Sequence, residues 1–176
     1  MSLRRLAPLL ASLLLSACMS TTQVNEVKPR PNINRHQGDK TISLHFGKDV
    51  REQFVIEATT FGDVEVTNWR ASLSNGFTHA FGRALPPIGV RPDLVIRLVR
   101  AEVGFTPVVA HGQGTAARAS IRYQANLVTP NDEVVRRTAG TVDSKRIVTS
   151  RARLSEATTE AIEALFETLT TELLER

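Results

Sequence analysis

The chain has 176 residues, 22 lysines and arginines against 18 acids, a formal net charge of +4, one tryptophan, one tyrosine and one cysteine. This length suits one domain of ordinary size. The weak positive charge and the scarcity of aromatic residues argue against nucleic-acid binding, and a single cysteine excludes an internal disulfide or a cysteine-rich metal site.

The first 17 residues predict an export signal. Arg4 and Arg5 supply the positive N-terminal region, and residues 6–15 (LAPLLASLLL) form a short apolar run. A run of about ten residues cannot span a bilayer, which needs about 20 helical residues. The pattern therefore predicts a signal peptide and no permanent transmembrane anchor.

Leu15, Ser16, Ala17 and Cys18 follow this run and resemble the bacterial lipobox. The resemblance implies cleavage between Ala17 and Cys18, with Cys18 as the site of lipidation by palmitate-like chains. Two or more acyl chains hold a protein stably on a membrane. The alternative is cleavage at an ordinary small-x-small site, which the bulky Leu15 disfavours. In such lipoproteins an aspartate after the cysteine implies retention at the inner membrane, so Met19 favours the outer membrane, facing the periplasm.

Residues 18–40 are polar and contain Pro29 and Pro31, a composition that does not compensate the entropy cost of ordering. We expect a flexible tether here, with a reach of about 25–30 Å. The globular periplasmic domain is expected to occupy residues 41–176.

The domain begins with an alternating segment over residues 42–46 (ISLHF), which predicts a strand with one buried face. Short apolar stretches at 54–58 and 64–66 are ambiguous in type. Residues 67–82 then change to helical spacing, with an apolar stripe formed by Trp69, Leu73, Phe77, Ala80 and Phe81. Gly76 lies on this stripe, which predicts close approach of another element.

Residues 85–93 (LPPIGVRPD) predict a rigid, turn-rich connection to a long strand over 94–105. Residues 117–127 alternate most clearly and, with a strand over 134–142, predict an antiparallel hairpin. Arg118, Arg122 and Gln124 fall on the polar face of this hairpin. This face is the candidate interaction surface.

Residues 155–176 predict a closing helix. Its apolar stripe consists of Ile162, Leu165, Phe166, Leu169 and Leu173, and its other side carries Glu156, Glu160, Glu163 and Glu167. An anionic membrane would repel this acidic side, so the helix is expected to pack on protein. The element order predicts an α+β fold in which an antiparallel or mixed sheet of about four to five strands carries two helices on one face.

No catalytic or metal-binding motif is present in the sequence. His36, His45, His79 and His111 lack the spacing of a metal site, and we expect no metal or other cofactor. Asp93, Glu102, Asp132 and Asp143 are carboxylates that could serve acid/base chemistry only if two of them meet in a cleft. We therefore expect a protein that is not an enzyme.

The layout resembles small outer-membrane lipoproteins of the YajG type and, more distantly, LptE-like and transport-auxiliary lipoproteins. The lipobox, the polar tether and the strand patterns of "PDLVIRLVRAEV" and "ARASIRYQANLV" carry this resemblance. It implies a lipid-anchored protein that binds another component of the cell envelope and implies no catalytic residues. A periplasmic binder of small molecules or lipids and a cell-wall hydrolase are the alternatives.

Overall fold

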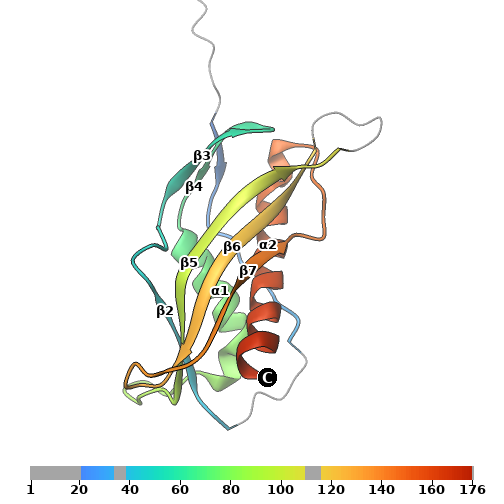
Figure 1. The fold of residues 1–176 in the computed structure, drawn as a ribbon. Coiled ribbons are helices and arrows are strands. Elements are labelled where there is room, and N and C mark those ends of the chain that lie inside the picture. Colours follow the sequence, from blue (N-terminus) through green and yellow to red (C-terminus); the bar gives the residue numbers. More distant parts are fainter. Residues whose placement is uncertain (1–20, 34–38, 110–115, 176) are drawn as a thin grey trace, which may run out of the picture.

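The computed structural model describes residues 21–33, 39–109 and 116–175 (Figure 1). Over these residues the fold is α+β, as predicted, with two long helices and seven strands in two mixed sheets. One sheet has the strand order β1-β4-β3 and the other β2-β5-β6-β7. The four-stranded sheet corresponds to the predicted sheet of about four to five strands, and the three-stranded sheet is additional to it.

The larger sheet is formed by β2 (Ile42–Phe46), β5 (Leu94–Pro107), β6 (Ala117–Val128) and β7 (Val134–Asp143). β2 pairs with β5 in parallel, whereas β5, β6 and β7 are antiparallel neighbours. The register shifts between Leu98 and Arg100, so β5 carries an irregularity at Val99 just beyond its pairing with β2. The predicted hairpin of residues 117–142 is confirmed as β6 and β7.

The smaller sheet contains β3 (Phe54–Thr59) and β4 (Gly62–Val66), which resolve the two ambiguous stretches as an antiparallel hairpin. Its third strand, β1 (Thr22–Val24), pairs with β4 in parallel. β1 lies within the segment that composition assigned to the flexible tether.

The described part of that segment packs on the domain, which corrects the prediction of a tether for residues 21–33. Val24 and Val27 are buried. The backbone N–H groups of Val27, Arg30 and Asn32 donate to side chains of the two helices, namely Ser72, Glu163 and Glu167. Scattered apolar residues and distant hydrogen-bond acceptors order this segment, and neither feature is visible in its composition. The rest of the predicted tether includes Cys18–Ser20 and residues 34–38, which lie outside the described residues.

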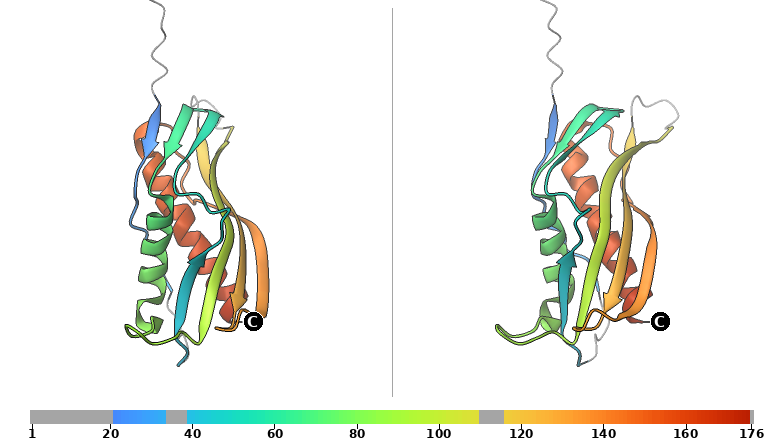
Figure 2. Two further views of the ribbon diagram at one scale, coloured as in Figure 1. Left: turned by 90° about the vertical axis from the view of Figure 1, so that its left-hand side faces the viewer. Right: turned by 60° about the vertical axis from the view of Figure 1, so that its left-hand side comes forward.

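Both helices lie on the same face of the larger sheet (Figure 2). α1 (Trp69–Phe81) continues into a short 3-10 turn, η1 (Gly82–Ala84), and α2 (Leu154–Leu169) follows a similar turn, η2 (Arg151–Arg153). α2 ends in a π-helical segment, η3 (Thr170–Leu174). The apolar stripe predicted for the second helix is confirmed, because all five of its residues are buried.

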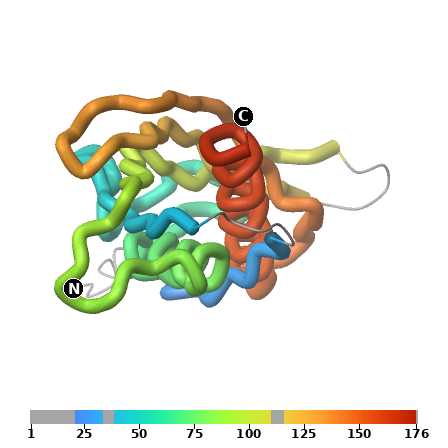
Figure 3. The backbone as a smooth tube through the Cα atoms, turned by 90° about the horizontal axis from the view of Figure 1, so that it is seen from below, coloured from blue at the N-terminus to red at the C-terminus, as the bar shows by residue number. Residues whose placement is uncertain are grey.

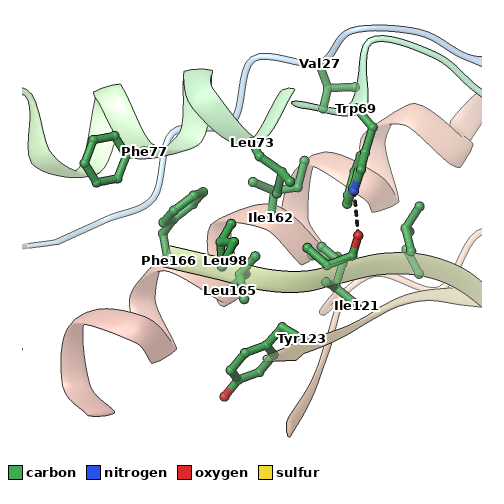
Figure 4. Close-up of a cluster of buried hydrophobic side chains, with 14 of the residues drawn as sticks. Val27, Trp69, Leu73, Phe77, Leu98, Ile121, Tyr123, Ile162, Leu165 and Phe166 are labelled. Carbon is green, nitrogen blue, oxygen red and sulfur yellow. Dashed lines mark hydrogen bonds between the residues drawn. The ribbon is translucent and has the colours of Figure 1, made fainter. Parts of the chain in front are cut away.

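The two helices approach closely at Gly76, as the sequence predicted. A Cβ atom on Gly76 would lie 2.8 Å from both Ile162 and Phe166 of α2. Phe166 also packs against Phe77 and Phe81, with ring centroids 6.2 and 6.3 Å away. The absent side chain thus allows the aromatic residues of α1 to reach α2 (Figure 4).

Trp69 connects α1 to the sheet beyond the irregularity in β5. Its indole nitrogen donates to the carbonyl oxygen of Ala101 at 2.8 Å, drawn as the dashed line in Figure 4. The ring is fully buried and meets Phe54 of β3 edge-to-face, with centroids 6.2 Å apart. Trp69 therefore joins α1, β3 and β5 in one core. In the part of the chain that the structure describes, no helix covers the outer side of the larger sheet (Figure 2).

Candidate interaction surface

The outer face of β5, β6 and β7 carries polar side chains in register. Ser120 of β6 lies opposite Gly104 and Asp143, and the next outward residue, Arg122, lies opposite Glu102 and Thr141. The intervening residues of β6 point to the helices and are buried: Ala119, Ile121, Tyr123 and Ala125. Strand alternation therefore places the charged residues of β6 on the side away from the helices.

A hollow of about 460 Å³ lies on this outer face, and we call it the sheet hollow. Its floor includes Gly104 and Ser120, which face each other across β5 and β6. A Cβ atom on Gly104 would meet no atom within 4 Å, so the missing side chain leaves open space above the sheet. The surrounding side chains are longer and polar: Glu102, Thr106, Arg118, Arg122, Thr141 and Asp143.

The two arginines of the sheet hollow have no ion-pair partner among the described residues, although acids lie close by. Arg118 is half-buried, and its Nε atom is enclosed without a hydrogen-bond acceptor. Arg122 is exposed. The two residues stand four positions apart on one face of β6, a separation of about 13 Å between their backbones. Both guanidinium groups therefore retain unused donors.

The two acids of the sheet hollow, Asp143 and Glu102, interact with neighbouring side chains other than Arg118 and Arg122. Ser120 donates its hydroxyl hydrogen to Asp143 at 2.6 Å, and its oxygen lies 3.2 Å from the Thr106 hydroxyl. Glu102 forms a 3.7 Å ion pair with Arg100, the next outward residue of β5. Since Arg100 offsets the charge of Glu102, the hollow and its border carry an excess of positive charge.

The structure brings together only some of the residues that the sequence singled out. Arg118 and Arg122 line the sheet hollow, while Gln124 lies one row further along the same face. Ala17 and Cys18 lie outside the described residues.

Of the four candidate acids, Glu102 and Asp143 share the hollow. The other two lie near the opposite end of the sheet, where Asp132 pairs with Arg97 and Asp93 lies beside Thr41. The Thr41 N–H and hydroxyl both donate to Asp93 at 2.8 Å and lower the pKa of this carboxyl.

The two histidines that the structure describes lie on different elements. His45 lies on β2 and His79 is exposed on α1, while His36 and His111 fall outside the described residues. Within residues 21–33, 39–109 and 116–175, no group of three or more histidine, cysteine, aspartate or glutamate side chains is arranged to hold a metal ion. Among the helices of the same ranges, none combines the length and apolar character needed to cross a bilayer.

A polar cluster on the inner side of the sheet was not predicted from the sequence. Tyr123 donates its hydroxyl hydrogen to Glu172 at 3.1 Å, Thr138 donates to the same carboxylate oxygen, and Arg136 donates to the carbonyl oxygens of Glu172 and Leu173. Burial raises the pKa of Tyr123; the hydrogen bond with Thr138 opposes this shift, and the Glu172 carboxylate adds to it. The cluster fastens the C-terminal turn to β6 and β7. The single polar residue on the apolar side of β6 was the only signal for it.

The same architecture is present in known proteins. The crystal structure of protein XCC0632 from Xanthomonas campestris, a DUF330 protein, matches with a TM-score of 0.58 and 18% identity, over 88% of this chain and 95% of that one. A minor lipoprotein from Acinetobacter baumannii matches with a TM-score of 0.50 and 11% identity, over 80% of this chain and 94% of that one. This chain shares its fold with a bacterial lipoprotein. At these identities the likeness shows the fold alone, and no family model and no curated protein matches the sequence.

Proposed function

We propose that this protein is an outer-membrane lipoprotein, anchored through Cys18 and facing the periplasm, that binds another cell-envelope component without catalysis. Its binding surface is the outer face of β5, β6 and β7. The observation that carries the proposal is the sheet hollow, where Arg118 and Arg122 have no ion-pair partner among the described residues.

The chemistry of the sheet hollow selects an acidic group on the partner. A guanidinium group donates through a planar fork that matches a carboxylate or a phosphate, and charge-assisted hydrogen bonds are stronger than neutral ones. Ser120, Thr106 and Thr141 add hydroxyl groups around the same space. A single partner that spans the hollow can therefore engage both arginines.

The anchor is supported by the lipobox and by the fold shared with a minor lipoprotein. Two or more acyl chains give stable attachment, whereas one chain gives only marginal binding. Attachment to a membrane raises the effective concentration of any partner confined to the same surface. An interface of modest size then suffices. The layout of lipobox and strand patterns also supports a finer assignment to the YajG type.

The interaction surface is tested by reversing its charge. We expect Arg118→Glu/Arg122→Glu to reduce crosslinked capture of the partner in the native envelope by about tenfold or more, because two charge-assisted contacts become repulsive. The matched control is Arg153→Glu, an exposed arginine of η2 outside this face, which should leave capture unchanged. Equal capture by the double variant, with its folding intact, would overturn the proposal.

The anchor is tested separately from the surface. We expect mass spectrometry of the mature protein to find an N-terminal Cys18 carrying acyl chains, and Cys18→Ala to release the protein from the membrane fraction. An unmodified thiol at Cys18 in the exported protein would contradict the anchor without affecting the test of the hollow.

A small anionic molecule is the second candidate ligand, because the hollow has the volume of an ordinary small-molecule site, which spans about 300–1,000 Å³. Equilibrium dialysis with inorganic phosphate and with a dicarboxylate distinguishes it from a macromolecular partner. Binding of the free anion that Arg118→Glu abolishes, with no protein captured, would favour the small ligand.

The non-catalytic part of the proposal has its own test. Glu102 and Asp143 are the acids that a hydrolase would use in the hollow. Purified protein should release no product from cell-wall fragments or from phospholipid vesicles. Release that Asp143→Asn abolishes would establish catalysis instead.

A further inference from the structure

The connection between η1 and β5 exposes apolar side chains at one end of the molecule. Ile88 is fully exposed, at 106% relative accessibility, and Leu85 and Val90 are exposed at 36% and 53%. We call residues 85–90 the apolar loop. The described residues contain eight exposed large apolar side chains. Five of them lie at this end of the molecule: the three of the apolar loop, together with Val134 and Val135 at the start of β7 (Figure 1). Scattered single exposures are ordinary, but such a concentration marks an interaction site.

The apolar loop is held in its protruding shape. Pro86 and Pro87 have fixed φ angles, and the N–H of Val90 donates to the carbonyl oxygen of Pro87 at 3.0 Å. Gly89 lies between them with a φ of 81°, a conformation that other residues adopt only with strain. Arg91 then ties the loop to the β6–β7 turn by donating to the carbonyl oxygen of Pro130 at 2.5 Å. Because little entropy remains to be lost, a rigid loop of this kind binds efficiently.

The apolar loop lies at the opposite end of the molecule from the point where the chain enters β1 (Figures 1 and 2). β5 runs between these ends, and its 14 residues span about 45 Å. In the sequence, only Met19, Ser20 and Thr21 separate Cys18 from the first residue of β1. Four extended residue steps cover at most about 14 Å, so a lipid on Cys18 holds the β1 end close to the bilayer.

We propose that the apolar loop is a docking point for a protein partner with an apolar pocket, and that this partner approaches from the side away from the anchoring bilayer. Ile88 enters the pocket, and Leu85 and Val90 exclude water around it, as an anchor residue and its rim do in protein interfaces. This inference rests on the proposed lipid anchor. The anchor at the other end is the reason to choose a protein over a membrane, because the loop lies about one β5 length from the anchored end.

The charges beside the apolar loop refine the partner. Arg83 and Arg91 flank it in the sequence and are exposed. Two exposed acids lie at the same end: Asp93, whose ionised form the hydrogen bonds from Thr41 favour, and Glu133, which precedes Val134. The pocket of the partner is therefore expected to have a polar border, with acidic side chains placed opposite Arg83 and Arg91.

The test uses the full-length protein in its native envelope, with a photo-reactive amino acid at position 88. We expect one discrete protein adduct. Val90→Asp should reduce its yield by about tenfold or more, because a charge is then placed in an apolar contact. Val55→Asp is the matched control, since Val55 of β3 is exposed to the same degree, 52% against 53%, and lies away from the loop. The purified partner should bind Ile88→Asp at least about tenfold more weakly than the unaltered chain.

Two results would overturn the inference. An adduct between position 88 and phospholipid would identify the loop as a membrane contact, and an adduct whose yield is equal in the Val90→Asp and Val55→Asp variants would show that the loop does not carry the interaction. The surface in the proposed function is read independently with the photo-reactive group at position 122, and the anchor by acyl-chain labelling. Loss of the signal at position 122 with retention of the adduct at position 88 would contradict the proposed surface alone. An exported protein without acyl chains would contradict both the anchor and the proposed direction of approach.

Discussion

The two faces of β6 differ in how completely their space is filled. On the inner face, Ala119, Ile121 and Ala125 are fully buried against the helices. On the outer face, Ser120 lies in a hollow of about 460 Å³, with an unpartnered guanidinium atom of Arg118 nearby. The same strand thus carries a close-packed surface and one with unused volume and unused hydrogen-bond donors.

The difference teaches where stability and binding reside in this fold. Apolar side chains that are removed from water and packed without gaps supply the free energy of folding. Donors without acceptors in the protein and an open hollow contribute little to folding and are suited to binding a ligand. Substitutions on the two faces should therefore affect different measurements.

The largest expected effect compares two neighbours on β6. Ile121→Ala removes a fully buried side chain from the core and should lower the free energy of unfolding by about 2–5 kcal/mol. Arg122→Ala, on the other face, should change it by less than about 0.5 kcal/mol. Urea denaturation of both variants measures the difference. Similar losses for the two variants would mean that the outer face is part of the folding core.

The next comparison uses one glycine from the helix contact and one from the outer face of the sheet. A Cβ on Gly76 would lie 2.8 Å from Ile162 and Phe166, so Gly76→Ala should overpack the helix contact and cost about 1–3 kcal/mol. Gly104→Ala meets open space on the sheet and should be neutral or stabilising by up to about 1 kcal/mol. The urea midpoint should therefore fall in Gly76→Ala and stay the same or rise in Gly104→Ala. A Gly76→Ala variant as stable as the unaltered chain would contradict the close approach.

The sequence could predict the outward residues of β6 because strand geometry alternates every residue. Arg118, Arg122 and Gln124 occupy alternate positions of β6 and therefore lie on the face opposite the buried Ile121 and Tyr123. Likewise, the apolar stripes at helical spacing predicted both α1 and α2, and Gly76 on the stripe of α1 indicated the close contact between the two helices. These features depend on local periodicity, which a single sequence contains.

The rest depends on distant parts of the chain. The sheet hollow exists because the register of β5 and β6 places Gly104 opposite Ser120, and the shift beyond Leu98 helps to set that register. The N-terminal segment is ordered by Glu163 and Glu167, more than a hundred residues away in sequence. Turn residues predicted a rigid connection at 85–93, but the full exposure of Ile88 follows only from where the loop lies in the fold.

A smaller effect is expected from the polar cluster that interrupts the apolar face of β6. Tyr123→Phe removes the hydrogen bond to Glu172 and should cost about 1 kcal/mol at neutral pH. Because burial raises the pKa of Tyr123 in the folded state, folding favours the protonated phenol. Stability from this group is therefore present below pH of about 10 and is lost as the pH rises through the higher folded-state pKa. Urea midpoints measured across alkaline pH should fall in the unaltered chain and fall less in Tyr123→Phe; parallel curves would rule out this role for Tyr123.

The smallest effect concerns Asp93, an exposed residue just before β5. Two hydrogen bonds from Thr41 lower the pKa of Asp93 below the usual value of 3.8, which means that folding favours the ionised form. The stability from Asp93 is present above its unfolded-state pKa and is lost as the pH falls through the lower folded-state pKa. Thr41→Val removes the hydroxyl donor but keeps the N–H, so the pKa of Asp93 should rise part of the way to its usual value. An NMR titration of the Asp93 carboxyl carbon measures this change, and an unchanged pKa would assign the whole shift to the backbone N–H. Because the contact between Thr41 and Asp93 is exposed to water at the edge of the sheet, its loss should change the titration of Asp93 and leave the packing of the inner face of β6 unchanged.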